Sequence, residues 1–246
     1  MNEKSFEEAR KKIVGIDRQR LGIGTYGEKT LHAILKNYYE PEEDRQEIPI
    51  ENYVADIYHD GQIMEIQTGQ FNRMRKKLSV FLPLYPVTIV YPIPELKWLI
   101  WVDETTGELS QKRKSPRKGT VYDVFPELYK IKNFLKEPNL NIRLVLLEVE
   151  EYKLLNGWSR DRKKGAGRFD RIPVQMTEEV TIQRAEDYMQ FIPPCLIEPF
   201  TVKEFGKEAH IPEKKASIVL NILYYMELVK RVGKKGNAYL YEILSY

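Results

Sequence analysis

The sequence predicts a mixed α/β fold with a central mixed sheet flanked by helices, followed by a smaller domain. Two observations support this prediction. Between residues 25 and 149, amphipathic helical stripes alternate with short apolar runs of strand type, a pattern typical of a sheet covered by helices. From about Glu178 onward, short helical segments and a hairpin replace this alternation. We therefore expect two domains, at residues 1–177 and 178–246.

The composition is that of a globular protein. Hydrophobic residues make up 42% of the 246 residues and charged residues 30%, which does not fit a disordered or fibrous chain. No apolar run approaches the ~18 residues that a membrane span needs, and the N-terminal sequence MNEKSFEEARKK contains no apolar segment typical of a signal peptide. We therefore expect a cytoplasmic protein. One cysteine and three histidines predict neither a disulfide framework nor a zinc site, which leaves a hard metal with oxygen ligands as the metal chemistry to consider.

The larger domain begins with a charged arm of helical type and a capped helix. Thr25 and Glu28 have the spacing of a capping box, in which each side chain satisfies a backbone N–H group of the other. The helix that follows ends before Pro41. Its apolar stripe consists of Leu31, Ile34, Leu35 and Tyr38.

A hairpin, a second helix and a buried strand come next. Strands are expected at residues 47–50, 54–59 and 62–68, with Asp60-Gly61 as the turn between the last two. The second amphipathic helix is followed by a strand at residues 87–91. The apolar stripe of this helix consists of Met74, Leu78, Phe81 and Leu82.

The remainder of the larger domain contains two basic segments. Residues 96–120 are interpreted as an excursion with one strand, a turn and the basic run QKRKSPRK. A third helix, with apolar residues at Phe125, Leu128, Ile131 and Leu135, and a buried strand at residues 142–149 follow. Residues 159–171 hold six basic residues and two glycines, which predicts a mobile basic loop near the domain boundary.

The hairpin register places two acids opposite each other. With Asp60-Gly61 as the turn, paired residues have numbers that sum to 121, so that Asp56 faces Glu65. Because side chains alternate along a strand, Gln67 shares the face of Glu65. The opposite face is predicted to be core and carries Ala55, Ile57, Met64 and Ile66.

Like charges that oppose each other across strands are destabilising. The pair is tolerated if solvent screens it, if one carboxyl group is protonated, or if a divalent cation lies between the two groups. A solvated sheet face with two coincidental acids is therefore one interpretation. The apolar face-mates Val54 and Ile63 favour a covered face instead, where two unpartnered carboxylates would be costly.

Residues 25–91 resemble the catalytic core of the PD-(D/E)XK nuclease superfamily, which includes restriction endonucleases and Holliday-junction resolvases. That core runs helix, three strands, helix, strand, and its signature is an acid on one strand followed by (D/E)-X-K on the next. Here Asp56 precedes Glu65-Ile66-Gln67, so glutamine stands in the lysine position. The resemblance implies a restriction-endonuclease-like fold in which Asp56 and Glu65 hold Mg²⁺ or Mn²⁺, with the Ile66 carbonyl as a further ligand. It also implies that Gln67 positions a water molecule and that Glu28 contributes another acid, unless Glu28 only completes the capping box.

Hydrolysis of a phosphodiester requires an activated water and neutralisation of the charge on the phosphoryl oxygens. Since the usual lysine is absent, a cation must come from elsewhere. Gln70, Arg73 and Lys77 share a stripe of the second helix that is separate from its apolar stripe. Arg73 and Lys77 are therefore candidates for contact with DNA at the site; the alternative is a solvated basic helix face.

Residues 200–243 resemble a winged helix-turn-helix domain. Thr201 can cap a short helix, Ile211-Pro212 makes the turn, and a longer helix precedes two strands around the basic wing 233–237. The core stripe of the longer helix consists of Ala216, Val219, Leu220, Leu223 and Met226. The resemblance implies that exposed residues of this helix and of the wing contact DNA, namely Lys214, Lys215, Ser217, Asn221, Lys234 and Lys235.

The main hypothesis is a Mg²⁺-dependent DNA endonuclease that acts on double-stranded DNA. The winged helix and the basic loop, with Arg162, Lys163 and Lys164, would attract the DNA through its phosphates. A homodimer is compatible with cutting both strands. The alternatives are a nuclease-fold regulatory or scaffold protein that binds DNA without cutting it, which the glutamine at 67 leaves open, and a protein-interaction module.

Overall fold

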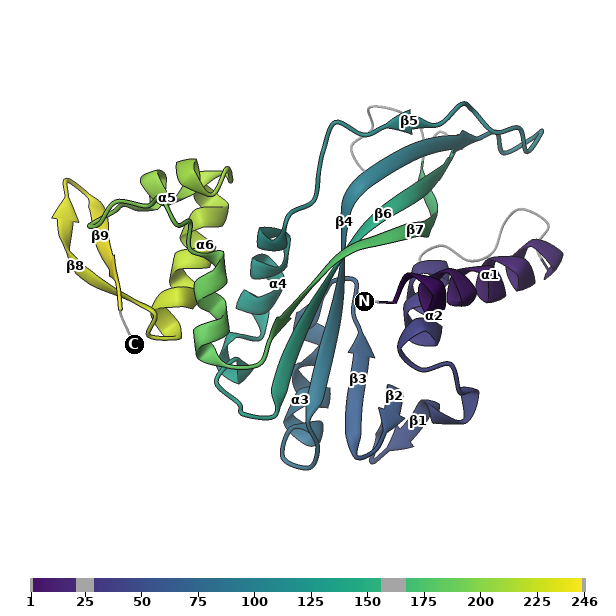
Figure 1. Ribbon diagram of the computed structural model, residues 1–246, viewed down its shortest axis with the longest axis horizontal. Coiled ribbons are helices and arrows are strands. Elements are labelled where there is room, and N and C mark those ends of the chain that lie inside the picture. The colour runs from purple at the N-terminus through teal and green to yellow at the C-terminus, as the bar shows by residue number, and fades with distance from the viewer. Residues whose placement is uncertain (1, 21–28, 156–166, 245–246) are drawn as a thin grey trace.

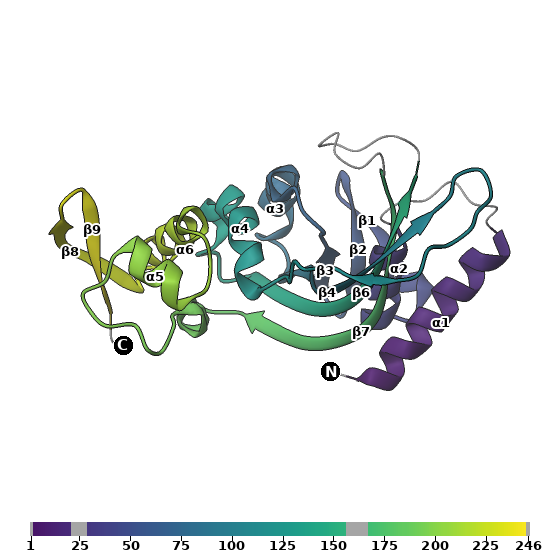
Figure 2. The ribbon, with the colours of Figure 1, turned by 90° about the horizontal axis from the view of Figure 1, so that it is seen from above.

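A computed structural model describes residues 2–20, 29–155 and 167–244 (Figures 1 and 2). The described chain is a mixed α/β protein with a central mixed sheet, helices on both faces and a smaller C-terminal lobe at one end. Thr25, Glu28, Arg162, Lys163 and Lys164 lie outside the described residues.

The first half of the chain follows the predicted order of elements. The charged N-terminal segment is a helix, and the next helix carries the predicted apolar stripe. Asp60 and Gly61 form the turn of a hairpin. A 3-10 turn at Phe71–Met74 leads into the third helix. The elements are α1 (Glu3–Arg20), α2 (Lys29–Tyr39), β1 (Gln46–Ile50), β2 (Tyr53–His59), β3 (Gln62–Ile66) and α3 (Arg75–Phe81).

The strands of the second half are much longer than predicted. The expected strands at 87–91 and 142–149 are parts of 16- and 15-residue strands, and residues 167–171 of the expected basic loop belong to another. The boundary expected between residues 177 and 178 falls within that last strand. The short helices and the hairpin of the C-terminal part therefore begin after Ile182. The elements are β4 (Val87–Val102), β5 (Arg113–Lys114), α4 (Phe125–Lys130), β6 (Leu140–Leu154) and β7 (Gly167–Ile182).

The strand order is β1-β2-β3-β4-β6-β7, with β5 paired to β4. The neighbours β3, β4 and β6 are parallel, and the other pairs are antiparallel. Strand β3 pairs with β4 only as far as Val90, whereas β4, β6 and β7 continue together. We call this continuation, residues 92–102, 145–154 and 167–179, the arm; it extends beyond the end of β3 (Figure 1).

Strand β4 contains two prolines, Pro92 and Pro94, and the pairing explains why the strand continues past them. The carbonyl of Val90 accepts from Gln67 N–H, so Val90 presents its backbone groups to β3. Pro92 and Pro94 have the same parity and present their nitrogens to the same edge, which β3 has already left. No ladder hydrogen bond is lost there, which is the condition under which a strand tolerates proline.

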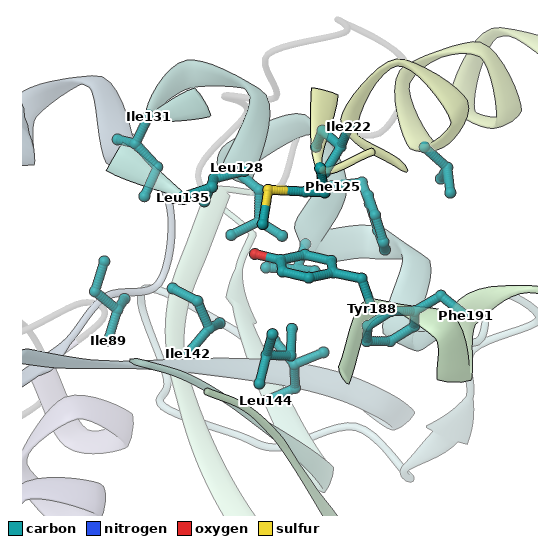
Figure 3. Close-up of a cluster of buried hydrophobic side chains, with 14 of the residues drawn as sticks. Ile89, Phe125, Leu128, Ile131, Leu135, Ile142, Leu144, Tyr188, Phe191 and Ile222 are labelled. Carbon is teal, nitrogen blue, oxygen red and sulfur yellow. The ribbon is translucent and has the colours of Figure 1, made fainter. Parts of the chain in front are cut away.

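Two clusters of buried side chains cover the two faces of the sheet. The first lies under α3 and α4 and includes Leu78 and Phe125. The second lies under α1 and α2 and includes Leu35 of α2 and Leu147 of β6. The first cluster continues into the C-terminal lobe. Figure 3 shows this continuity, with side chains of α4, of β4 and β6 and of the segment Ala185–Phe191 gathered near one from the lobe.

The C-terminal lobe has the predicted helices and hairpin. Its elements are α5 (Val202–Glu208), α6 (Glu213–Tyr225), β8 (Val229–Lys235) and β9 (Ala238–Ile243). Thr201 caps α5 in a capping box with Glu204, and the predicted core stripe of α6 is buried. None of the helices in the described ranges is both long and apolar enough to span a membrane.

Candidate active site

The hairpin brings Asp56 and Glu65 together. The predicted register holds for three pairs, from His59 with Gln62 to Ile57 with Met64. Beyond these pairs, side chains replace the backbone ladder. Asp56 N–H donates to Glu65 Oε1 at 3.3 Å, and Ile66 N–H donates to Asp56 Oδ2 at 2.8 Å. Each carboxylate therefore accepts a hydrogen bond from the opposite strand, which fixes the two acids side by side.

A basic side chain from each flanking helix layer contacts one of the two acids. His32 of α2 places Nε2 3.1 Å from Asp56 Oδ2, and Lys77 of α3 donates to Glu65 Oε2 at 2.6 Å. The side chains of Glu65 and Lys77 are 5% and 18% exposed. These contacts offset part of the repulsion between the acids. The sequence-based candidate Lys77 thus reaches the site, whereas Arg73 is exposed.

The two acids have opposite pKa shifts. Burial, together with the nearby charge of Asp56, raises the pKa of Glu65 to about 7 against the opposing effect of Lys77. Burial also acts to raise the pKa of Asp56, but the hydrogen bond and charge of His32, together with the Ile66 N–H, hold it below its ordinary value. At neutral pH, Asp56 is ionised, whereas Glu65 lies close to its pKa.

The expectation of a covered face is correct for Glu65 and Ile63 but wrong for Val54. Glu65 and Ile63 are 4% and 1% exposed, while Val54 is 51% exposed. Strand β2 is flanked by the edge strand β1, and Val54 lies near the edge of the sheet. Of the two acids, Glu65 is buried, whereas the side chain of Asp56 keeps 22% of its surface exposed.

The residues after Glu65 have distinct roles. Ile66 presents its N–H to β2, and because the N–H and C=O groups of one strand residue point to the same edge, its carbonyl also lies on the side of Asp56. Gln67 donates from Nε2 to the Gly69 carbonyl at 2.5 Å. The glutamine side chain thus holds the turn after β3 in place.

The donor set consists of oxygen atoms. Both hydrogen bonds of the Asp56 carboxylate use Oδ2, which leaves Oδ1 without a hydrogen-bond donor among the described residues. Asp56 Oδ1, the Glu65 carboxylate and the Ile66 carbonyl are ligands that suit Mg²⁺ or Mn²⁺. Mg²⁺ takes one or two carboxylates and keeps several of its waters. Within the described ranges, no group of three or more His, Cys, Asp or Glu side chains is arranged to hold a metal ion.

The predicted contacts of the C-terminal lobe divide into two groups. Lys214, Ser217, Lys234 and Lys235 are exposed. Lys215 and Asn221 are only partly exposed, which corrects the expectation that they lie on the exposed side of this helix: Lys215 pairs with Asp123, and Asn221 Oδ1 accepts from Lys132 at 3.2 Å. These two residues face the larger lobe because the apolar stripe of α6 packs there.

His32 is the residue of the site that sequence reasoning missed. In the sequence it comes four residues after Glu28, the acid that the resemblance singled out, and residues four apart share a face of a predicted helix. That spacing is the signal by which it could have been found.

Comparison with known proteins places the chain in a family. Residues 29–183 match the family described as "Domain of unknown function (DUF8091)". The chain belongs to this family. The matched region begins with α2 and ends after β7, so it contains Asp56, Glu65, His32 and Lys77 together with the arm.

A relative from Treponema pallidum (strain Nichols), described as "Uncharacterized protein", is 29% identical over 167 residues. The match covers 68% of this chain and 64% of the relative, so the chain spans just under two thirds of that protein's length. No solved structure matches the chain.

Proposed function

We propose that this protein is a metal-dependent DNA endonuclease of the PD-(D/E)XK type, with a restriction-endonuclease-like core and a winged-helix C-terminal domain. The observation that carries the proposal is the pair Asp56 and Glu65, fixed side by side by hydrogen bonds to each other's strand. Two acids held this way on adjacent strands, followed by a helix that supplies a cation, are the arrangement that the sequence motif implies.

Different residues of the site would have different roles in hydrolysis. Asp56, Glu65 and the Ile66 carbonyl would hold Mg²⁺ or Mn²⁺, which when bound supplies Lewis acidity and lowers the pKa of water. Lys77 brings a positive charge to the place where negative charge develops on the phosphoryl oxygens.

Lys77 therefore takes the part that the missing motif lysine would have. Its ammonium group lies 2.6 Å from Glu65 Oε2, although it comes from α3 and not from β3. A lysine two residues after Glu65 would share the face of that acid, and the helix above the same face offers an equivalent position. This contact supports an active site despite the glutamine at 67.

The C-terminal lobe supplies surface for DNA. A cleft of about 510 Å³ is lined by residues of α5, α6 and the hairpin, among them Lys203, Lys214, Ser217, Arg231 and Asn237. Cationic and amide side chains of this kind contact phosphates and base edges. The DNA partner, its double-stranded form and a homodimer are parts of the same proposal.

A DNA-binding protein that does not cut is the second candidate, and one observation favours it. The Gln67 amide donates to the Gly69 carbonyl, so it is already engaged and would have to turn to orient a water molecule.

A plasmid-nicking assay with Mg²⁺ or Mn²⁺ tests the proposal. The protein should nick the plasmid, and Asp56→Ala and Glu65→Ala should each lower the rate by about a hundredfold or more. The matched control is Glu104→Ala, which removes an exposed acid from a turn far along the chain and should leave the rate unchanged. Calorimetric titration with Mn²⁺ should show binding to the parent protein and none to Asp56→Ala.

The alternatives give different results. DNA binding without nicking in either metal would support the non-cutting candidate and refute the nuclease. No retention of DNA at low salt would support a protein-interaction module.

A further inference from the structure

We propose that a small basic pocket at the base of the arm binds a backbone phosphate of the DNA strand, next to the phosphate that is cleaved. This inference rests on the proposed nuclease function and adds a second anion site to it. The pocket has a volume of about 170 Å³. That is below the ~300 Å³ at which cavities for whole small molecules begin, and it suits a single phosphate group with its waters.

Four segments far apart in the sequence build the pocket. Thr68 follows β3, residues 91–97 belong to β4, Arg117 and Gly119 belong to the segment after β5, and Arg171 belongs to β7. Thr68 lies directly after Gln67, so one wall of the pocket continues the strand that carries Glu65. The pocket therefore begins just beyond the end of the strand that carries Glu65.

The segment after β5 is held tightly against the arm. Gly119 N–H donates to the carbonyls of Pro94 and Glu95 at 3.1 and 3.2 Å. A Cβ atom at Gly119 would lie 2.5 Å from the Pro94 carbonyl oxygen, so only glycine allows this approach. The close contact fixes Arg117 at the rim of the pocket.

The pocket carries a net positive charge. Three cations line it, Lys97, Arg117 and Arg171, against one acid, Asp123. Asp123 is engaged already, because Lys215 pairs with its Oδ1 and Thr120 N–H donates to its Oδ2 at 3.1 Å. Arg171 is likewise paired, with Glu151, so an anion that enters the pocket would meet above all the exposed guanidinium of Arg117.

The two arginines have complementary positions. Arg171 is 14% exposed, and its Nε donates to Glu151 Oε2 at 2.9 Å, which fixes the plane of the guanidinium group. Arg117 is exposed, and its guanidinium forms no ion pair with any residue in the described ranges. A fixed and an adjustable guanidinium match the fork geometry with which arginine binds phosphate oxygens.

Binding of a labelled DNA duplex by fluorescence anisotropy, without divalent metal, tests the pocket separately from cleavage. Arg117→Ala should weaken binding about tenfold, as loss of a charge-assisted hydrogen bond predicts. It should also reduce the slope of log K against log salt by about 1, which corresponds to one phosphate contact. Arg117→Lys should keep most of the slope.

The matched control is Arg113→Ala. Arg113 is also exposed, stands in β5 four residues before Arg117 and does not line the pocket, so both changes remove the same charge. Equal effects of the two alanine variants would refute the pocket, as would no effect of either. Binding with the predicted difference but without nicking would refute only the nuclease, and absence of duplex binding would refute both proposals.

Discussion

Replacement of Glu65 by glutamine should change how the stability of the protein depends on pH. Burial and the charge of Asp56 raise the pKa of Glu65 from its ordinary 4.5 to about 7. Between these values the folded protein holds a proton that the unfolded chain has released, so the free energy of unfolding falls as pH rises. Since one pH unit corresponds to about 1.4 kcal/mol, the whole fall contributes about 3 kcal/mol.

Glu65→Gln is neutral at every pH and should lack this fall. The difference in unfolding free energy between Glu65→Gln and the parent protein should therefore move by about 3 kcal/mol in favour of the variant between about pH 4 and about pH 8. Urea denaturation in the absence of divalent metal, followed by circular dichroism, measures it. Comparison across pH removes any constant cost of the substitution, such as the altered contact with Lys77.

Glu104→Gln, at an exposed position, provides the control and should follow the parent protein at each pH. If Glu65→Gln showed the same pH dependence as the parent protein, the burial and coupling of the two acids would be refuted.

Three further changes test other parts of the structure, each by urea denaturation. Lys77→Met leaves the buried Glu65 without its cation and should lower the free energy of unfolding by about 3 kcal/mol at alkaline pH; Arg73→Met, at an exposed position, should change it little. Gly119→Ala places a Cβ atom against the backbone of β4 and should cost about 2 kcal/mol, whereas Gly69→Ala meets open space; equal costs would contradict the close approach. Thr201→Ala removes the cap of α5 and should cost about 1 kcal/mol, with rescue by Thr201→Ser.

Local patterns in the sequence determined most of the elements and half of the site. The apolar stripe of α2, the turn at Asp60 and Gly61 and the Thr201 cap of α5 were predicted because each depends on residues within a few positions of one another. The approach of Asp56 to Glu65 belongs to the same class, since a two-residue turn fixes the register of a hairpin.

Tertiary structure decided what depends on distant segments. Strand β4 continues past its prolines only because β3 has ended beside it. Lys215 and Asn221 of α6 face inward because the apolar stripe of this helix packs against the larger lobe. Lys77 and His32 reach the acids from helices on opposite faces of the sheet. The spacing of residues within one helix determines which face of that helix each side chain lies on. Only the packing of the helix against the sheet determines which side chains of other segments contact that face.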